Sequence, residues 1–281
     1  RFRSEPVRRS SAFLASVLVA FAVAPTLHAA TIERALNRMY NFDFDSADGE
    51  LDRYVSEHPG DALGYTFRAS ALLFRELDRL SILEGEFLTS DKRIADKKKM
   101  SPDAGLKTRF HAAVDRSKSL AQGRLGVDGS DKNALFAMCL NSGLITDYMC
   151  LVEKRQLASL AYAKESHNFA VKLLKVDSGF TDAYLTTGMT EYLLGSVPFF
   201  VKWFVRFEDA EGNKKLAVER LKSVVERGKY LGPFAKILLA IIDMREKRPL
   251  QAEIKLSELS KDFPENPLFK KEIEKLRPKL K

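Results

Sequence analysis

The chain has 281 residues, of which 45% are hydrophobic and 30% are charged, and its formal net charge is +8 at pH 7. This composition is that of an ordinary folded protein and excludes a largely disordered chain. The positive charge is gathered in residues 1–30, 91–99 and 270–281 instead of covering one face. No nucleic-acid partner is therefore expected, and the two later clusters are interpreted as solvated surface.

Residues 1–30 have the pattern of a secretory signal peptide. Arginines precede an apolar run over 12–24, and the small pair Ala29 and Ala30 follows it. The apolar run is shorter than the ~20 residues of a membrane-spanning helix, and no stop-transfer segment comes after it. We expect cleavage near Ala29 or Ala30, export to the periplasm or the medium, and a folded domain over 31–281.

Helical spacing of apolar residues predicts a protein built of helices. The first runs over 31–40, the second starts after the capping residue Asp45 and ends near His58, and the third starts near Ala62. Further helices are predicted over 134–148, 152–175, 183–194, 214–227, 233–245, 250–262 and 268–276. No strand pattern is present, so the sequence predicts an all-α fold of about ten to twelve helices.

One helix pattern occurs twice, near both ends of the predicted domain. A small residue is followed by two apolar residues and a proline at the same offsets: Ala47, Leu51, Tyr54 and Pro59, and again Ala252, Leu256, Leu259 and Pro264. The first three residues share one helix face, and the proline ends the helix. Because such a helix cannot bury its apolar face alone, the recurrence predicts helices that stack on one another in a row.

These residues resemble the tetratricopeptide repeat (TPR) family, in which helix pairs stack into an α-solenoid. The turns between the predicted units are unequally spaced, so the expected fold is an irregular TPR-like α-solenoid with inserted helices or loops near 85–104 and 195–212. Segments 151–155 and 230–235 are similar to exported bacterial TPR-type proteins of undefined role. The resemblance implies a fold, and the binding of another molecule, but no activity.

The resemblance also implies a concave groove lined by the first helix of each pair. Tyrosine and arginine favour binding because they supply large contact area with few rotatable bonds. The groove candidates are Tyr65, Arg68, Tyr148, Tyr184, Glu191 and Tyr192. Two of them, Tyr65 and Tyr184, also occupy positions that pack the repeat itself.

Residues 198–207 combine a large apolar surface with two cations. In a helix their apolar side chains would cover about 240° of arc and leave only Lys202 and Arg206 on the remaining strip. One interpretation is a short helix wedged between repeats, and the other is a patch that contacts a membrane surface or an apolar partner groove. The patch candidates are Phe199, Phe200, Lys202, Trp203, Phe204 and Arg206.

No pattern typical of a catalytic, metal or cofactor site occurs. His58, His111 and His167 lack metal-binding spacing, and no phosphate loop, dinucleotide fingerprint or nucleophile elbow is present. Cys139 and Cys150 lie ~16 Å apart on an unbroken helix, so free thiols are expected unless the helix folds back between them. We expect no metal, no cofactor and no enzymatic activity.

The sequence thus predicts an exported, non-catalytic scaffold that binds a protein, a peptide or another cell-envelope component. Two alternatives stay open. The first is an exported α-helical enzyme or glycan-binding protein built on the same scaffold, with Asp147, Glu153 and Asp182 facing one groove. The second is a peripheral membrane adaptor that uses residues 197–207.

Overall fold

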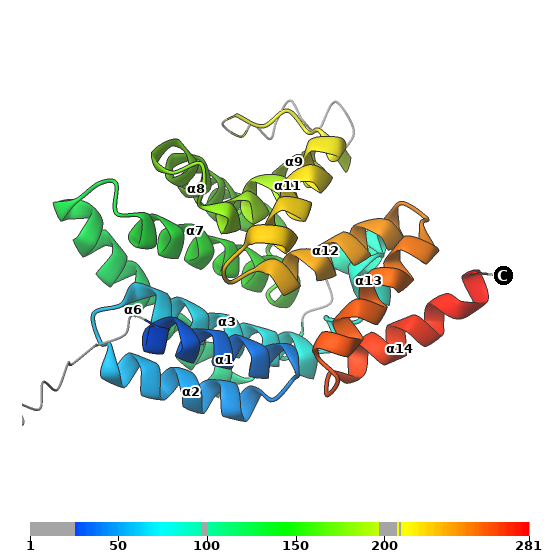
Figure 1. Cartoon of the computed structure of the whole chain (residues 1–281), viewed down its shortest axis with the longest axis horizontal. Coiled ribbons are helices and arrows are strands. Elements are labelled where there is room, and N and C mark those ends of the chain that lie inside the picture. The colour runs from blue at the N-terminus through cyan, green and yellow to red at the C-terminus, as the bar shows by residue number, and fades with distance from the viewer. Residues whose placement is uncertain (1–25, 97–99, 197–206, 208, 281) are drawn as a thin grey trace, which may run out of the picture.

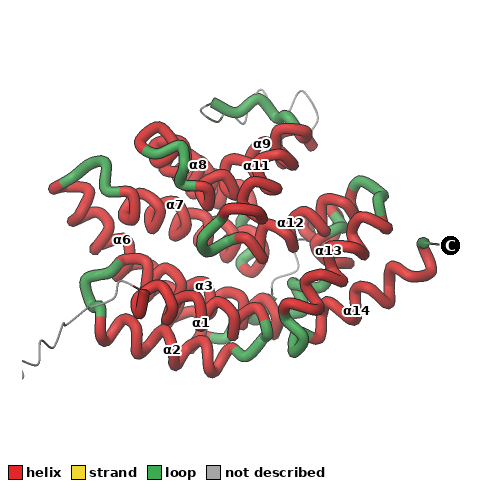
Figure 2. Tube along the Cα trace, viewed as in Figure 1, coloured by secondary structure: helices red, strands yellow, loops and turns green. Residues whose placement is uncertain are grey.

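The computed structural model describes residues 26–96, 100–196, 207 and 209–280. Within them it contains helices, turns and loops but no strand (Figure 2). The predicted all-α class is therefore confirmed. The described helices cover the segments in which apolar residues recur at the spacing of a helix face.

The N-terminal part holds the long helices α1, α2, α3, α6 and α7 and two short ones. Their bounds are α1 Thr26–Tyr40, α2 Phe44–Glu57, α3 Ala62–Arg79, α4 Gly85–Leu88, α5 Asp91–Ala95, α6 Ala104–Val127 and α7 Lys132–Asp147, followed by a π-helical turn over Tyr148–Val152. The C-terminal part holds α8 Gln156–Val176, a 3₁₀ turn over Thr181–Ala183, α9 Tyr184–Ser196, α11 Lys214–Arg227, α12 Gly232–Arg245, α13 Pro249–Asp262 and α14 Pro267–Leu276, with a last 3₁₀ turn over Arg277–Lys279.

Each long helix packs on the next long helix of the chain. The pairs run from α1 with α2, through α3, α6, α7, α8, α9, α11 and α12, to α13 with α14, and α3 also packs on α7. Figure 1 shows this order as a curved row that begins with α1 to α3 at the bottom and ends with α13 and α14 at the right. Neighbours in sequence are thus neighbours in space, which is how a helix with one apolar stripe buries it.

The row curls back on itself around α12. The ring of Tyr230, in the turn before α12, lies 5.1 Å from the ring of Phe67 in α3 and 6.2 Å from that of Phe136 in α7 (centroid distances). Near the end of the chain, Asn266 Nδ2 donates to the Tyr40 carbonyl at 2.7 Å. One hydrophobic core therefore includes buried residues from both ends of the described chain.

Asp and Asn side chains cap the starts of six described helices. Asp61, Asp131 and Asn213, for example, each accept a backbone N–H two or three residues on, which satisfies a donor that has no partner within the helix. The predicted cap Asp45 is wrong. Asp43 accepts from Ser46 N at 3.2 Å, so α2 begins at Phe44 and Asp45 lies in its first turn.

Both copies of the repeated pattern form helices with the expected buried face. Their small and apolar residues are all at most 4% exposed, and the two helices, α2 and α13, end two residues before their prolines. In α2, the Tyr54 ring lies directly against Gly64 of α3, where an added Cβ would be 2.6 Å from Tyr54 Cδ1. The close approach explains a glycine inside a helix, which otherwise lowers helix stability.

The predicted helix over 152–175 is wrong at its start. The chain continues from α7 through the π-helical turn and reverses at Glu153–Arg155, where Lys154 adopts φ 59°, so α8 begins only at Gln156. The reversal is closed by Arg155 N donating to the Met149 carbonyl at 2.8 Å. Cys139 lies in α7 and Cys150 in the π-helical turn that continues it, so the helix does not fold back between them and both thiols are free.

A buried polar network explains the polar residues inside α7. Asn141 Nδ2 donates to Ser117 Oγ of α6 at 2.8 Å and to Thr66 Oγ1 of α3 at 3.2 Å.

Lys132–Val152 is long and apolar enough to cross a membrane by length and composition alone, but 56% of its apolar window is buried against the protein. In this structure it serves as a core helix.

The insertion expected near 85–104 is present as α4 and α5, which lie between α3 and α6. A second core cluster joins this region to α3, α6 and the end of α7. Of the insertion expected near 195–212, residues 197–206 and 208 lie outside the described residues.

Candidate binding cleft

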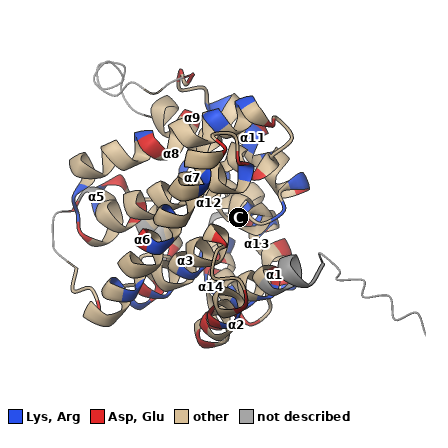
Figure 3. Cartoon of the chain, turned by 90° about the vertical axis from the view of Figure 1, so that its left-hand side faces the viewer, with Lys and Arg blue, Asp and Glu red and all other residues tan. Residues whose placement is uncertain are grey.

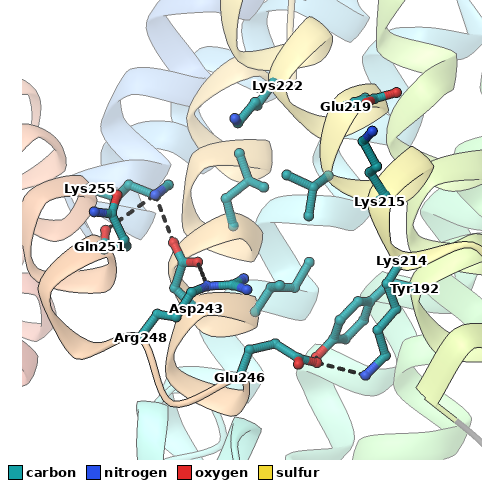
Figure 4. A pocket seen from close by; sticks show the side chains of 13 residues that line it. Tyr192, Lys214, Lys215, Glu219, Lys222, Asp243, Glu246, Arg248, Gln251 and Lys255 are labelled. Carbon is teal, nitrogen blue, oxygen red and sulfur yellow. Dashed lines mark hydrogen bonds and ion pairs between the residues drawn. The ribbon is translucent and has the colours of Figure 1, made fainter.

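Four helices enclose a cleft of about 500 Å³ near the C-terminal end of the row. Its floor comes from α12, its walls from α11 and from α13 with the turn before it, and the ring of Tyr192 from α9 lines one end (Figure 4). We call it the α11–α13 cleft. It is lined by Tyr192, Lys214, Lys215, Val218, Glu219, Lys222, Leu239, Ile242, Asp243, Glu246, Arg248, Gln251 and Lys255.

Helical spacing places these residues on facing surfaces. On α11, Lys215, Val218 and Lys222 are three and four positions apart and share one face. The opposite face of α11 carries Ala217 and Leu221, which are fully buried in the core. An amphipathic helix thus packs its apolar side into the protein and turns its lysines toward the cleft.

The floor of the cleft is apolar. Leu239 and Ile242 of α12 are 4% and 2% exposed, and Val218 of α11 is half-buried beside them. An apolar floor with polar groups around it is the usual composition of a ligand site.

Two carboxylates at the bottom of the cleft neutralise part of its positive charge. Asp243 accepts from Arg248 Nε at 2.8 Å and from Lys255 Nζ at 2.7 Å. Glu246 accepts from Lys214 Nζ at 2.8 Å and from the Tyr192 hydroxyl at 3.3 Å. The hydrogen bond from Lys214 is the main reason that the pKa of Glu246 lies below its ordinary value.

Lys215 and Lys222 are the two cations of the cleft lining that have no carboxylate partner in the described residues. Both are exposed, and neither forms an ion pair within the described part of the chain. The lining holds five cations and three carboxylates, so it favours an anionic ligand. None of its lining residues is a histidine, cysteine, serine or threonine.

Three of the six predicted groove residues gather around α11. Tyr192 lines the cleft, and the buried Glu191 accepts from Gly212 N and Asn213 N at 2.8 Å, which holds the start of α11. Tyr184 lines a separate cavity of about 380 Å³ on the other side of α11, together with Arg220.

The other three predicted groove residues lie elsewhere and do not meet the first three. Arg68 pairs with Asp52 at 2.6 Å, and the Tyr65 ring lies 5.8 Å from the Arg116 guanidinium. Tyr148 is buried at the end of α7 and stacks on a phenylalanine of α6. The structure therefore does not place the six residues in one groove.

Two carboxylates of the alternative site, Asp182 and Glu153, are engaged in separate contacts. Asp182 is buried and accepts backbone N–H groups of Lys229, Tyr230 and Leu231 at 2.8–3.3 Å. Glu153 pairs with Lys107 at 2.7 Å. In the part of the chain that the structure describes, no group of three or more His, Cys, Asp or Glu residues could hold a metal ion.

The candidates of the aromatic patch, Phe199, Phe200, Lys202, Trp203, Phe204 and Arg206, lie outside the described residues. Phe207 is described, and its ring contacts His167 edge to face at a centroid distance of 5.5 Å. His167 is fully buried and shares a hydrogen bond with Thr190 Oγ1 at 3.0 Å. This histidine therefore belongs to the packing of α8 against α9.

Sequence reasoning did not identify the lysines of the cleft. Their spacing on α11 is that of any solvated face of an amphipathic helix, and the other wall and the floor come from helices further along the chain. In the view of Figure 3, Lys and Arg are interleaved with Asp and Glu.

Comparison with known proteins gives no relative: no family model, no curated protein and no solved structure matches this chain.

Proposed function

We propose that the protein is an exported, non-catalytic helical-repeat scaffold with a TPR-like solenoid arrangement. In this proposal it binds a protein, a peptide or another cell-envelope component in the α11–α13 cleft. The observation that carries the proposal is the cleft itself, in which an apolar floor is bordered by two lysines that no carboxylate of the described chain neutralises. Export is inferred from the signal pattern of residues 1–30.

Two further observations support a binding role over a catalytic one. Consecutive helices pack on one another in a row, an arrangement that exposes extended surfaces to partners. The titratable groups at the bottom of the cleft, Asp243 and Glu246, are already held by cations and hydrogen bonds. The hydrogen bond from Lys214 lowers the pKa of Glu246, so this carboxylate is a poor proton acceptor.

Site-specific photo-crosslinking tests the proposal. A benzophenone amino acid is placed at Gln251, an exposed residue of the cleft, and in a second variant at Lys261, an exposed residue at the far end of the same helix. Both proteins are irradiated in an extract of the cell envelope. We expect a discrete crosslinked partner from position 251 and none from position 261. Equal products from both positions, or none from either, would contradict the proposal.

A further inference from the structure

The α11 wall of the cleft presents positive, apolar and positive side chains in that order. Lys215, Val218 and Lys222 follow one another on one face, and the two lysines are seven residues apart. At 1.5 Å per residue, this separation is about 10.5 Å along the helix axis. Two lysines about two helical turns apart suit a ligand with two separated negative charges.

The middle of the same wall disfavours a third negative charge. Glu219 lies between the two lysines in sequence, lines the cleft and forms no ion pair within the described residues. Next to it, the floor offers Leu239 and Ile242, both buried. The ligand should therefore carry an uncharged, apolar group between its two anionic groups, because a carboxylate at the centre would meet Glu219 and lose its hydration over an apolar floor.

We infer that the cleft binds an acidic peptide segment in which two carboxylate side chains flank an apolar side chain. An extended chain advances about 3.3 Å per residue and points every second side chain to the same side. Two carboxylates four positions apart, with the apolar side chain midway between them, therefore lie on one side and span about 13 Å, which is within reach of the flexible side chains of Lys215 and Lys222. A membrane surface fits less well, because a flat layer of headgroups would reach the exposed lysines and leave the recessed floor uncovered. This inference rests on the proposed function and names the class of its partner.

The test uses fluorescence anisotropy of a labelled octapeptide that is blocked at both ends. It contains two glutamates four positions apart with a leucine midway between them, and in two control peptides the glutamates become glutamines or the leucine becomes serine. The protein variants are Lys215→Gln/Lys222→Gln and, as a matched control with the same loss of charge, Lys172→Gln/Lys261→Gln at exposed positions outside the cleft. Circular dichroism verifies that both variants are folded.

We expect the acidic peptide to bind the wild type and to bind Lys215→Gln/Lys222→Gln about three- to tenfold more weakly, which is the combined loss of two exposed ion pairs. The matched control should change the affinity less than twofold. The glutamine and serine peptides should each bind more weakly than the parent peptide, and raising the salt concentration should weaken the parent peptide most.

Three results would overturn the inference. They are equal binding of the glutamate and glutamine peptides, equal loss in both double variants, and capture by anionic lipid vesicles that requires Lys215 and Lys222 without any peptide binding. The crosslinking experiment separates this failure from failure of the proposed function. If position 251 still captures its partner in the Lys215→Gln/Lys222→Gln background, the cleft is a binding site and only the acidic class is wrong.

Discussion

Asp182 should be one of the most important polar residues for stability, because it closes the turn that leads into the floor of the cleft. Its carboxylate is 3% exposed and accepts the backbone N–H groups of Lys229 at 2.9 Å, Tyr230 at 3.2 Å and Leu231 at 2.8 Å. These three donors precede α12 and have no other hydrogen-bond acceptor in the described structure.

Replacing Asp182 by alanine leaves these donors without a partner. Tyr230 and Leu231 are buried, so water cannot easily replace the carboxylate there, whereas Lys229 is exposed. An unsatisfied buried polar group costs about 1–3 kcal/mol, so the two buried donors predict a loss of about 2–5 kcal/mol in the free energy of unfolding. Asp182→Asn retains one acceptor oxygen and should lose less, about 1–2 kcal/mol, because a charged acceptor is the stronger partner.

Urea denaturation followed by far-UV circular dichroism measures these differences. The matched control is Asp177→Ala, because Asp177 also caps a turn, accepting from Gly179 N at 2.9 Å, but is partly exposed. Water can replace its carboxylate, so the expected loss is below about 1 kcal/mol. The reasoning would be refuted if Asp182→Ala were as stable as the wild type or lost no more than Asp177→Ala.

Three further measurements follow from the packing and the charges. Gly64→Ala should lower the free energy of unfolding by about 1–2 kcal/mol, because overpacking against Tyr54 outweighs the gain in helix propensity. Gly49 lies in open space on α2, so Gly49→Ala should leave the stability unchanged or raise it by up to about 1 kcal/mol. Equal effects of the two variants in chemical denaturation would show that the contact at Gly64 is not tight. NMR titration should find the pKa of Glu246 below its ordinary value, and Lys214→Met should raise that pKa. The stabilisation by this ion pair is therefore present above the unfolded-state pKa of Glu246 and is lost as the pH falls through the folded-state pKa. An unchanged pKa of Glu246 in the variant would contradict this. Under native conditions an alkylating reagent should modify the partly exposed Cys150 well before the buried Cys139. Detection of a disulfide between them by mass spectrometry would contradict the free thiols.

The all-α class and many helix bounds could be predicted because they depend on local signals. The helix predicted over 214–227 has those bounds in the structure, since its apolar positions and the cap Asn213 are close together in sequence. The start of α2 was misplaced because Asp43 and Asp45 are both good capping residues, and only the backbone conformation shows that Asp43 is the cap. The break before α8 was missed because Lys154, a residue rarely found at positive φ, carries no turn signal.

The cleft could not be predicted, because it depends on how four helices are placed relative to one another. Lys215 and Lys255 are forty residues apart on separate helices, and each one alone has the signature of an ordinary surface lysine. Tyr192 was named from the sequence as a binding residue, and the structure places it in the cleft lining. Its binding role stays a prediction.

The contacts of Tyr230 limit where helices could be inserted into the row. In an open stack each unit touches only its neighbours, so copies can be inserted or deleted without disturbing distant units. Here the ring of Tyr230, in the turn before α12, contacts the rings of Phe67 and Phe136, which lie 163 and 94 residues earlier in the chain. Duplicating a helix pair between them would pull these rings apart, so this fold should tolerate duplication only outside the segment that they close.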